Sequence, residues 1–253
     1  MPKFLPFPPT SRCEPSIVRQ PSTIYESQST YYCGTMPKAD GSSVVVRSQR
    51  RASYQRARSH ETKRGLVQSA MALWRTNGYA KTTVADICRA AGVSRALFYF
   101  YFPAKEDVLF EVGLLSTRSA QQRIRDLLNT DYEVVPTIGE ALRRLERSMS
   151  CNPPELIIET ILQGYRYEHR ILAGQADPDD LKPDMFGELF TRAQADGKLA
   201  AHVDVAHLSH LAQILVSEGV RHWACGSYGS RSFTEVVTHD IAALIAGFDT
   251  VNP

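Results

Sequence analysis

Long apolar runs are absent from this 253-residue sequence, and none approaches the ~18 residues that a membrane-spanning helix needs. The first residues, MPKFLPFPP, are too few and too interrupted by proline to form the apolar core of a signal peptide. We therefore expect a cytoplasmic protein with no membrane partner.

The short motifs of common enzyme classes are also missing. The sequence has no GxSxG, GxGxxG, phosphate-binding loop or HExxH. The best metal candidates are two pairs, His207 with His210 and His222 with Cys225. These pairs lie ~3–4 helical turns apart, too far to share one ion within a chain. We predict neither an enzyme, nor a cofactor, nor a metal site.

Acidic residues are scarce in one part of the chain only. Residues 36–105 hold 13 Lys and Arg against three Asp and Glu, a net charge of +10. Residues 106–253 hold 13 against 22, a net charge of −9. This asymmetry is typical of a protein in which one domain contacts a polyanion and the other does not.

The most informative stretch lies inside the basic part, at residues 82–105, TTVADICRAAGVSRALFYFYFPAK. Its first half predicts a short helix whose apolar residues recur at helical spacing: Val84, Ile87, Cys88 and Ala91. Thr83 precedes this helix as a cap, with Asp86 in the first turn. Gly92 follows the helix and can adopt a positive φ. The sequence therefore predicts a helix-turn-helix.

The second short helix follows Ser94, another capping residue, and it carries the expected chemistry. Phe98 and Phe102 can point back into a small core. The side chains left facing outward are Arg95, Ala96, Leu97, Tyr99 and Tyr101. Such a surface suits a DNA duplex, with hydroxyls and backbone amides for phosphates and a guanidinium for a base edge. Lys105, just beyond, can hold one more phosphate.

This stretch resembles the DNA-binding domain of TetR/AcrR-family transcriptional regulators. The residues that match the family pattern are Thr83, Ile87, Ala91, Gly92, Val93, Ser94, Tyr99, Tyr101, Phe102, Lys105 and Glu106. The resemblance implies phosphate contacts from Thr83, Ser94, Tyr99, Tyr101 and Lys105. It implies base contacts from Arg95, Ala96 and Leu97. Cys88 replaces a small alanine of the pattern, and Ala104 replaces a capping Ser or Asn, a loss typically worth ~0.5–2 kcal/mol.

The domain organisation follows from composition and helical periodicity. We expect an all-α protein with a disordered extension at 1–46, a basic arm at 47–58, a three-helix head at 59–106 and a helical bundle at 107–253. Its first helix should run from about residue 60 to 76. The arm, with Arg47, Arg50 and Arg51 and no carboxylate, is expected to order on DNA and to follow phosphates or a minor groove. A merely solubilising tail is the alternative.

The bundle is the expected place for a small molecule. Its central helices carry bulky amphipathic side chains that could together line an apolar cavity with a few polar tips: Tyr165, Tyr167, His169, Phe186, Phe190 and Trp223. Each of them alone is more simply a core residue. In the resembled family, an inducer or corepressor occupies this place.

The last two predicted helices carry more apolar surface than one protomer needs. We expect a symmetric homodimer interface that includes Leu208, Leu211, Leu215, Gly219, Phe233, Val237, Ile241 and Leu244. Such a dimer presents two recognition helices to a palindromic operator.

The sequence thus predicts a sequence-specific DNA-binding transcriptional regulator, a repressor released by a small apolar or amphipathic ligand. Two alternatives belong to other classes. An architectural DNA-binding protein without an effector would bind random duplex almost as well as an operator. An all-α enzyme or adaptor that merely keeps a helix-turn-helix head would bind DNA weakly.

Overall fold

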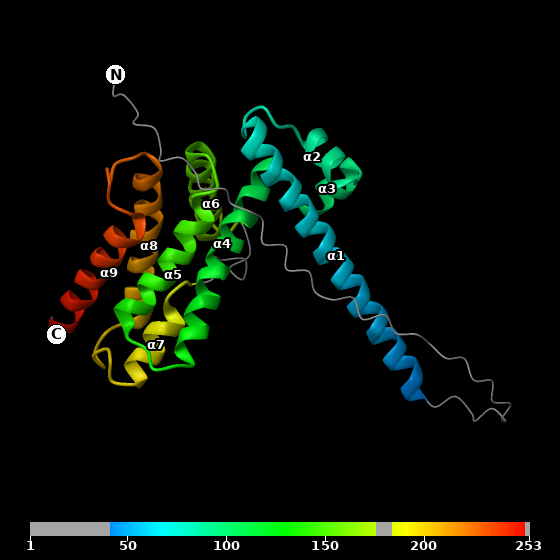
Figure 1. The fold of residues 1–253 in the computed structure, drawn as a ribbon. Coiled ribbons are helices and arrows are strands. Elements are labelled where there is room, and N and C mark those ends of the chain that lie inside the picture. Colours follow the sequence, from blue (N-terminus) through cyan, green and yellow to red (C-terminus); the bar gives the residue numbers. More distant parts are fainter. Residues whose placement is uncertain (1–40, 176–183, 251–253) are drawn as a thin grey trace, which may run out of the picture.

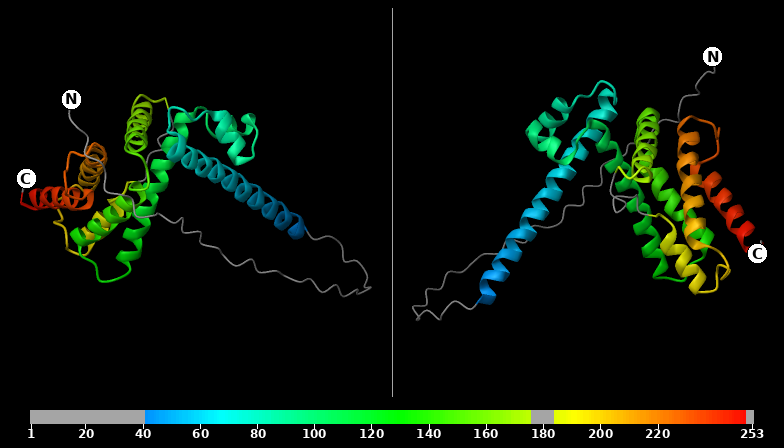
Figure 2. Two further views of the ribbon diagram at one scale, coloured as in Figure 1. Left: turned by 45° about the horizontal axis from the view of Figure 1, so that its top comes forward. Right: turned by 180° about the vertical axis from the view of Figure 1, so that it is seen from behind.

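The computed structural model describes residues 41–175 and 184–250, and for residues 41–56 and Asp249 it describes the backbone only. All regular secondary structure in these residues is helical, as predicted. Figures 1 and 2 show two parts. We call α1 (Gly41–Asn77), α2 (Val84–Ala91) and α3 (Arg95–Tyr101) the head. The remaining helices form the bundle.

The head is built around the carboxyl half of α1, which packs across α2 and α3. Its core contains Trp74 and Phe98, both fully buried, together with Leu66, Val67, Ala70, Ile87, Cys88 and Phe102. Val108 and Leu109 from the first helix of the bundle, and Leu156 from another, complete this cluster. The head therefore shares its core with the bundle and is not a separate module on a linker.

Local capping fixes the two short helices as the sequence predicts. The Thr83 hydroxyl accepts from the Asp86 backbone N–H, and the Asp86 carboxylate accepts from the Thr83 N–H, which completes a capping box. Gly92 ends α2 in the left-handed conformation, with φ of 67°. The Ser94 hydroxyl then accepts from the Leu97 N–H at 3.1 Å and starts α3.

The first helix is longer than the sequence analysis predicts. Helix α1 begins at Gly41 and spans 37 residues, so residues 41–46 of the expected extension and all of the expected arm are helical. Between Ser42 and Arg64 there is no proline or glycine, and this segment therefore continues the helix without a break. In Figures 1 and 2 its amino-terminal half runs away from the bundle. Residues 1–40 lie outside the described residues.

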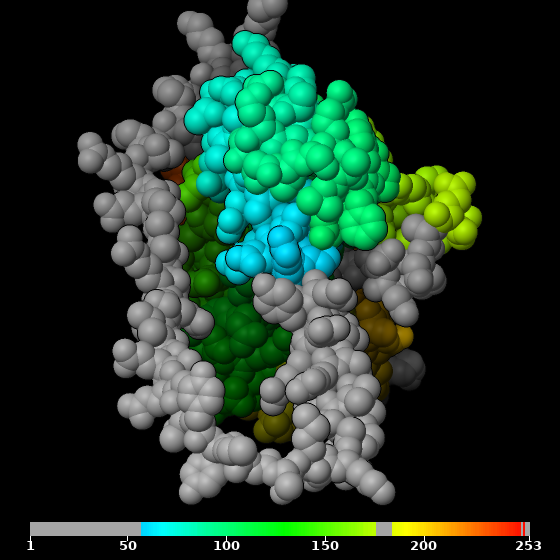
Figure 3. Space-filling model, turned by 90° about the vertical axis from the view of Figure 1, so that its right-hand side faces the viewer, coloured from blue at the N-terminus to red at the C-terminus, as the bar shows by residue number. Residues whose placement is uncertain are grey.

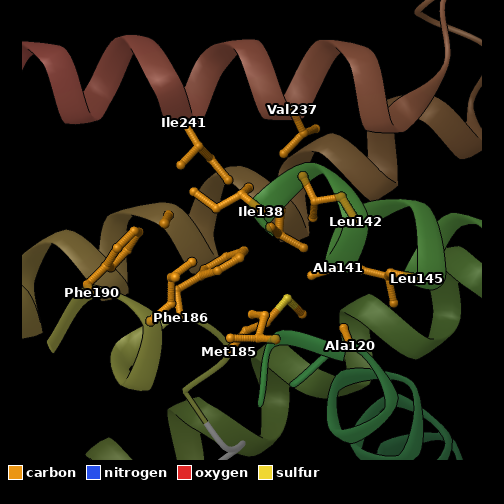
Figure 4. Packing of buried hydrophobic residues seen from close by; sticks show 14 of the residues in the cluster. Ala120, Ile138, Ala141, Leu142, Leu145, Met185, Phe186, Phe190, Val237 and Ile241 are labelled. Atoms are coloured by element: carbon orange, nitrogen blue, oxygen red, sulfur yellow. The ribbon is translucent and has the colours of Figure 1, made fainter. Parts of the chain in front are cut away.

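The bundle consists of α4 (Lys105–Leu128), α5 (Val134–Met149), α6 (Pro154–Leu172), α7 (Gly187–Ala195), α8 (Val205–Ala224) and α9 (Phe233–Thr250). Figure 4 shows its main core, where Ile138 and Leu142 of α5 face Val237 and Ile241 of α9. Phe186 and Phe190 lie on the opposite side of the same core. No helix in the described ranges is long and apolar enough to cross a membrane.

The expected dimer interface requires a correction, because α8 and α9 pack against each other. Five of its residues are buried inside the protomer: Leu208, Gly219, Phe233, Val237 and Ile241. A Cβ added at Gly219 would overlap the Val237 side chain, so this glycine serves a close approach within one chain. Leu211, Leu215 and Leu244 are partly exposed. The sequence shows two apolar faces on these helices but not which face the protomer uses.

Candidate DNA-binding face and ligand cavities

Helix α3 presents its outward face to solvent, at the end of the head that lies away from the bundle (Figure 1). Phe98 and Phe102 are buried, as predicted. Ser94, Arg95, Ala96 and Tyr99 are exposed, while Leu97 and Tyr101 are partly buried. The structure therefore brings most of the predicted contact residues together on one surface. In the space-filling view of Figure 3, the helices of the head form a continuous rounded surface.

Phe100 is not among the residues that the sequence predicts to contact DNA. In the part of the chain that the structure describes, it is the most exposed of the large hydrophobic aromatic residues, at 76%. It lies two residues from buried Phe98, on the opposite side of α3, and four residues after Ala96. The spacing contained this signal, since a helix that buries positions 98 and 102 must expose position 100. Phe100 thus lies near the centre of the outward face.

Two predicted phosphate-binding residues make hydrogen bonds within the protein. The Tyr101 and Ser59 hydroxyls share a hydrogen bond of 2.9 Å, which joins α3 to α1. The Lys105 ammonium donates to the carbonyls of Tyr79 and Thr82, both at 3.1 Å, and lies 4.1 Å from the centre of the Tyr79 ring. Burial, and then the Glu106 carboxylate, raises the pKa of Tyr79. Tyr101 and Lys105 therefore both stabilise the head through contacts within the protein.

Arg47, Arg50 and Arg51 lie on the amino-terminal half of α1, where the structure describes the backbone only. Their contact with DNA remains a prediction. Because the segment is helical, any such contact would come from a helix and not from an extended arm.

Two cavities lie in the bundle. The first, of about 70 Å³, is lined mostly by apolar residues of α4, α5, α6 and α8, among them Val112, Leu145, Met149, Ile157, Ile161 and Val216. The second, of about 190 Å³, lies between α4, α6 and α8 and is more polar. Gln213 and Ser217 of α8 line both. The two cavities therefore adjoin at these side chains.

A larger groove, of about 610 Å³, lies between the head and the bundle. Figure 3 shows α4 set back beneath the head on this side. Lys63 of α1 donates to the Glu111 carboxylate of α4 at 2.6 Å, and Arg170 of α6 lies 3.6 Å from the Asp107 carboxylate. These ion pairs connect α1 and α6 to the start of α4.

Two stacked rings form a wall shared by the groove and the second cavity. Phe110 of α4 and Tyr167 of α6 have ring centres 3.8 Å apart, and both line each space. The Arg170 guanidinium lies 4.7 Å from the centre of the Tyr167 ring. A change in the cavity that moves Tyr167 can therefore reach Arg170 and Asp107.

Comparison with known proteins identifies the head. Residues 66–112, from the middle of α1 into α4, match the family described as bacterial regulatory proteins, tetR family. The chain therefore resembles TetR-family regulators over its head. Over 47 residues it is 43% identical to the HTH-type transcriptional regulator EthR of Mycolicibacterium smegmatis, a match that covers 19% of this chain and 22% of that protein. The matched segment thus spans about a fifth of that relative.

Solved structures extend the likeness to the fold of the bundle. The TetR-family transcriptional repressor FadR of Thermus thermophilus, solved with lauroyl-CoA, has a TM-score of 0.54 and 24% identity, covering 76% of this chain and 96% of that one. RolR, solved with resorcinol, also has a TM-score of 0.54, with 14% identity and coverage of 75% and 89%. At these identities, the comparison supports the fold alone.

The structure separates the six residues predicted to line a pocket in the bundle. Tyr165 and Tyr167 line the second cavity. His169 is exposed, and Phe186 and Phe190 are fully buried in the main core. Trp223 is partly buried, with its ring 6.3 Å from that of Phe233. None of these last four lines either cavity, because α7 packs Phe186 and Phe190 toward α5 and α8.

Proposed function

We propose that this chain is a sequence-specific DNA-binding transcriptional regulator, and that it acts as a repressor released by a small apolar or amphipathic molecule. The observation that carries the first part is the outward face of α3 on a basic head. Arg95, Tyr99 and Phe100 are exposed there, and the Ser94 cap and the shared core hold the helix in place. A rigid exposed helix of this kind fits a major groove.

We propose that two copies bind a palindromic operator. The outer faces of α8 and α9 keep partly exposed apolar side chains, namely Leu211, Leu215 and Leu244, and Ile214 is 42% exposed. A symmetric contact between these faces would bury them in both protomers. The two recognition helices would then match half-sites about one helical turn apart, ~34–36 Å.

Ligand release is supported by the position of the cavities. They lie against α4, whose first turn packs on the head through Val108 and Leu109. A ligand can shift the head only if it binds one arrangement of α4 and α6 better than the other. The Arg170–Asp107 and Lys63–Glu111 ion pairs join these helices and α1, so they are the contacts through which such a difference would act.

The test starts with selection of genomic fragments that the full chain binds, followed by anisotropy titrations against the selected duplex and a scrambled duplex. We expect Arg95→Ala to weaken the preference for one or two base pairs, by about 1–3 kcal/mol. Tyr99→Phe should weaken binding to both duplexes alike, because phosphate contacts carry no sequence information. Equal affinity for both duplexes would instead support the architectural alternative.

A further inference from the structure

We propose that the second cavity binds a ligand that donates a hydrogen bond and carries no negative charge, such as a hydroxyl-bearing molecule, with its apolar body directed toward the first cavity. This inference rests on the proposed function and specifies the chemical class of the ligand that releases the repressor from DNA.

Two unsatisfied polar atoms in the cavity wall point to a hydrogen-bonding ligand. Ser209 is only 1% exposed, and its Oγ has no hydrogen-bond partner. The Oε1 of Gln213 is likewise buried without a partner. Both residues line the second cavity, and they lie four positions apart on α8, hence on one face. Leaving such an atom unsatisfied is costly, and a ligand with a donor group in this cavity would remove the cost.

Gln213 determines which partner is missing, because an amide oxygen can only accept a hydrogen bond. Ser209 can accept or donate. A ligand that satisfies the Gln213 oxygen must therefore bring an O–H or N–H group. An ether or ester oxygen can accept from the Gln213 NH2 group but would leave the Gln213 oxygen without a partner.

The charges around the second cavity disfavour an anion. Its ionisable lining residues are Glu168, Asp184, His210 and the two tyrosines Tyr165 and Tyr167. Neither cavity has a lysine or arginine among its described lining residues. Tyr165 donates its hydroxyl to Glu218 at 3.0 Å, and burial, followed by that bond, raises the pKa of Tyr165 to about 12. A carboxylate or phosphate ligand would thus face two carboxylates, with no lysine or arginine among the described lining residues to offset them. The guanidinium beside this wall, that of Arg170, lies against the Tyr167 ring and 3.6 Å from the Asp107 carboxylate.

The first cavity supplies the place for an apolar body. Gln213 and Ser217 stand at the junction, and beyond them the wall is formed largely by aliphatic and methionine side chains. A polar group at Gln213 therefore fits a molecule whose other end is hydrocarbon. The two volumes, about 70 and 190 Å³, favour a small amphipathic molecule.

Matched nine-heavy-atom probes test the donor requirement, with calorimetric titration of the full chain. The probes are 1-octanol, which donates, and heptyl methyl ether, which does not. Octanoate adds a negative charge to the same eight-carbon chain. We expect octanol to bind about fivefold to tenfold more tightly than the ether, the ratio for one net hydrogen bond. We expect octanoate to bind more weakly than both.

A variant locates the effect at Gln213. Gln213→Met keeps an unbranched side chain of similar length but removes the orphan oxygen, so the variant should unfold at a higher temperature without ligand and bind octanol and the ether equally. Gln68→Met, at an exposed position of α1, is the matched control and should keep the octanol preference.

The inference is overturned if octanoate binds as tightly as octanol, if none of the three probes binds, or if Gln213→Met keeps the preference for octanol over the ether. These outcomes are distinct from failure of the proposed function. That failure would appear as equal affinity for the selected and scrambled duplexes in the absence of any probe.

Discussion

Lys105 offers a direct test of how the structure changes the interpretation of a sequence motif. The family resemblance assigns its ammonium to a phosphate. In the structure, two of the three N–H donors of that ammonium bind the Tyr79 and Thr82 carbonyls, and the charge lies over the Tyr79 ring. Lys105 therefore connects the start of α4 to the turn between α1 and α2. Removing it should loosen the head itself.

The magnitude follows from these contacts. A hydrogen bond from a charged donor contributes about 1.5–3 kcal/mol, and a cation–π contact about 0.5–1 kcal/mol. Because Lys105 is only partly buried, we expect Lys105→Ala to lower the free energy of unfolding by about 2–4 kcal/mol. If the third N–H binds a phosphate, the slope of log K against log salt should also fall by about 0.9 per head. For a dimer with two heads, a fourfold rise in salt would then weaken DNA binding by Lys105→Ala about tenfold less than binding by the wild type.

Urea denaturation followed by circular dichroism measures the first effect, and anisotropy at several salt concentrations measures the second. Lys81→Ala is the control, because it removes the same charge from an exposed position near the same turn. Equal stability of the two variants would refute the structural role. A destabilised Lys105→Ala protein with an unchanged salt slope would exclude the phosphate contact.

Three further predictions concern other parts of the fold. Gly219→Ala should lower the free energy of unfolding by about 1–3 kcal/mol, because the new Cβ would overlap the Val237 side chain. Gly65→Ala is the matched control: no atom lies within 4 Å of its new Cβ, so it should raise the free energy of unfolding by up to about 1 kcal/mol. Thermal denaturation measures both. Deleting residues 1–58 removes part of α1 and five arginines that deletion of residues 1–40 leaves in place. The longer deletion should therefore reduce helix content, DNA affinity and the dependence of affinity on salt. If the two truncated proteins bind DNA equally, residues 41–58 do not contribute to binding. The pKa of Tyr165 is raised to about 12 in the folded state, so as the pH rises the unfolded state loses the Tyr165 proton first. The stability that the protonated Tyr165 contributes is therefore complete below about pH 10 and is lost between about pH 10 and 12. Tyr165→Phe should lose less stability than the wild type in that range, and an identical alkaline profile would contradict the assignment.

The head could be predicted in detail because its signals are local. Thr83, Gly92 and Ser94 each act on backbone groups within a few residues, so their roles can be inferred from spacing alone. The buried face of α3 follows from the positions of Phe98 and Phe102 in the same way. The exposed position of Phe100 was available from this pattern as well.

The bundle was less predictable, because its helices have more than one apolar face. Whether Phe190 lines a cavity or fills the core depends on where α7 packs, and no local signal specifies that. The same holds for Ile241, which the protomer uses against α5 and not against a second copy. A cavity in the bundle was expected, but most of its lining residues were missed for a related reason: Gln213 and Ser209 acquire their meaning only from the helices around them.

The stack of Phe110 on Tyr167 has a kinetic consequence. A molecule that passes between the groove and the second cavity has to part these rings, and the energy of parting them opposes entry and departure equally. A barrier of this kind sets how quickly the protein responds to a change in ligand concentration, while the equilibrium occupancy stays the same. Two such proteins with equal dissociation constants could therefore differ in how long a bound ligand persists after its supply ends.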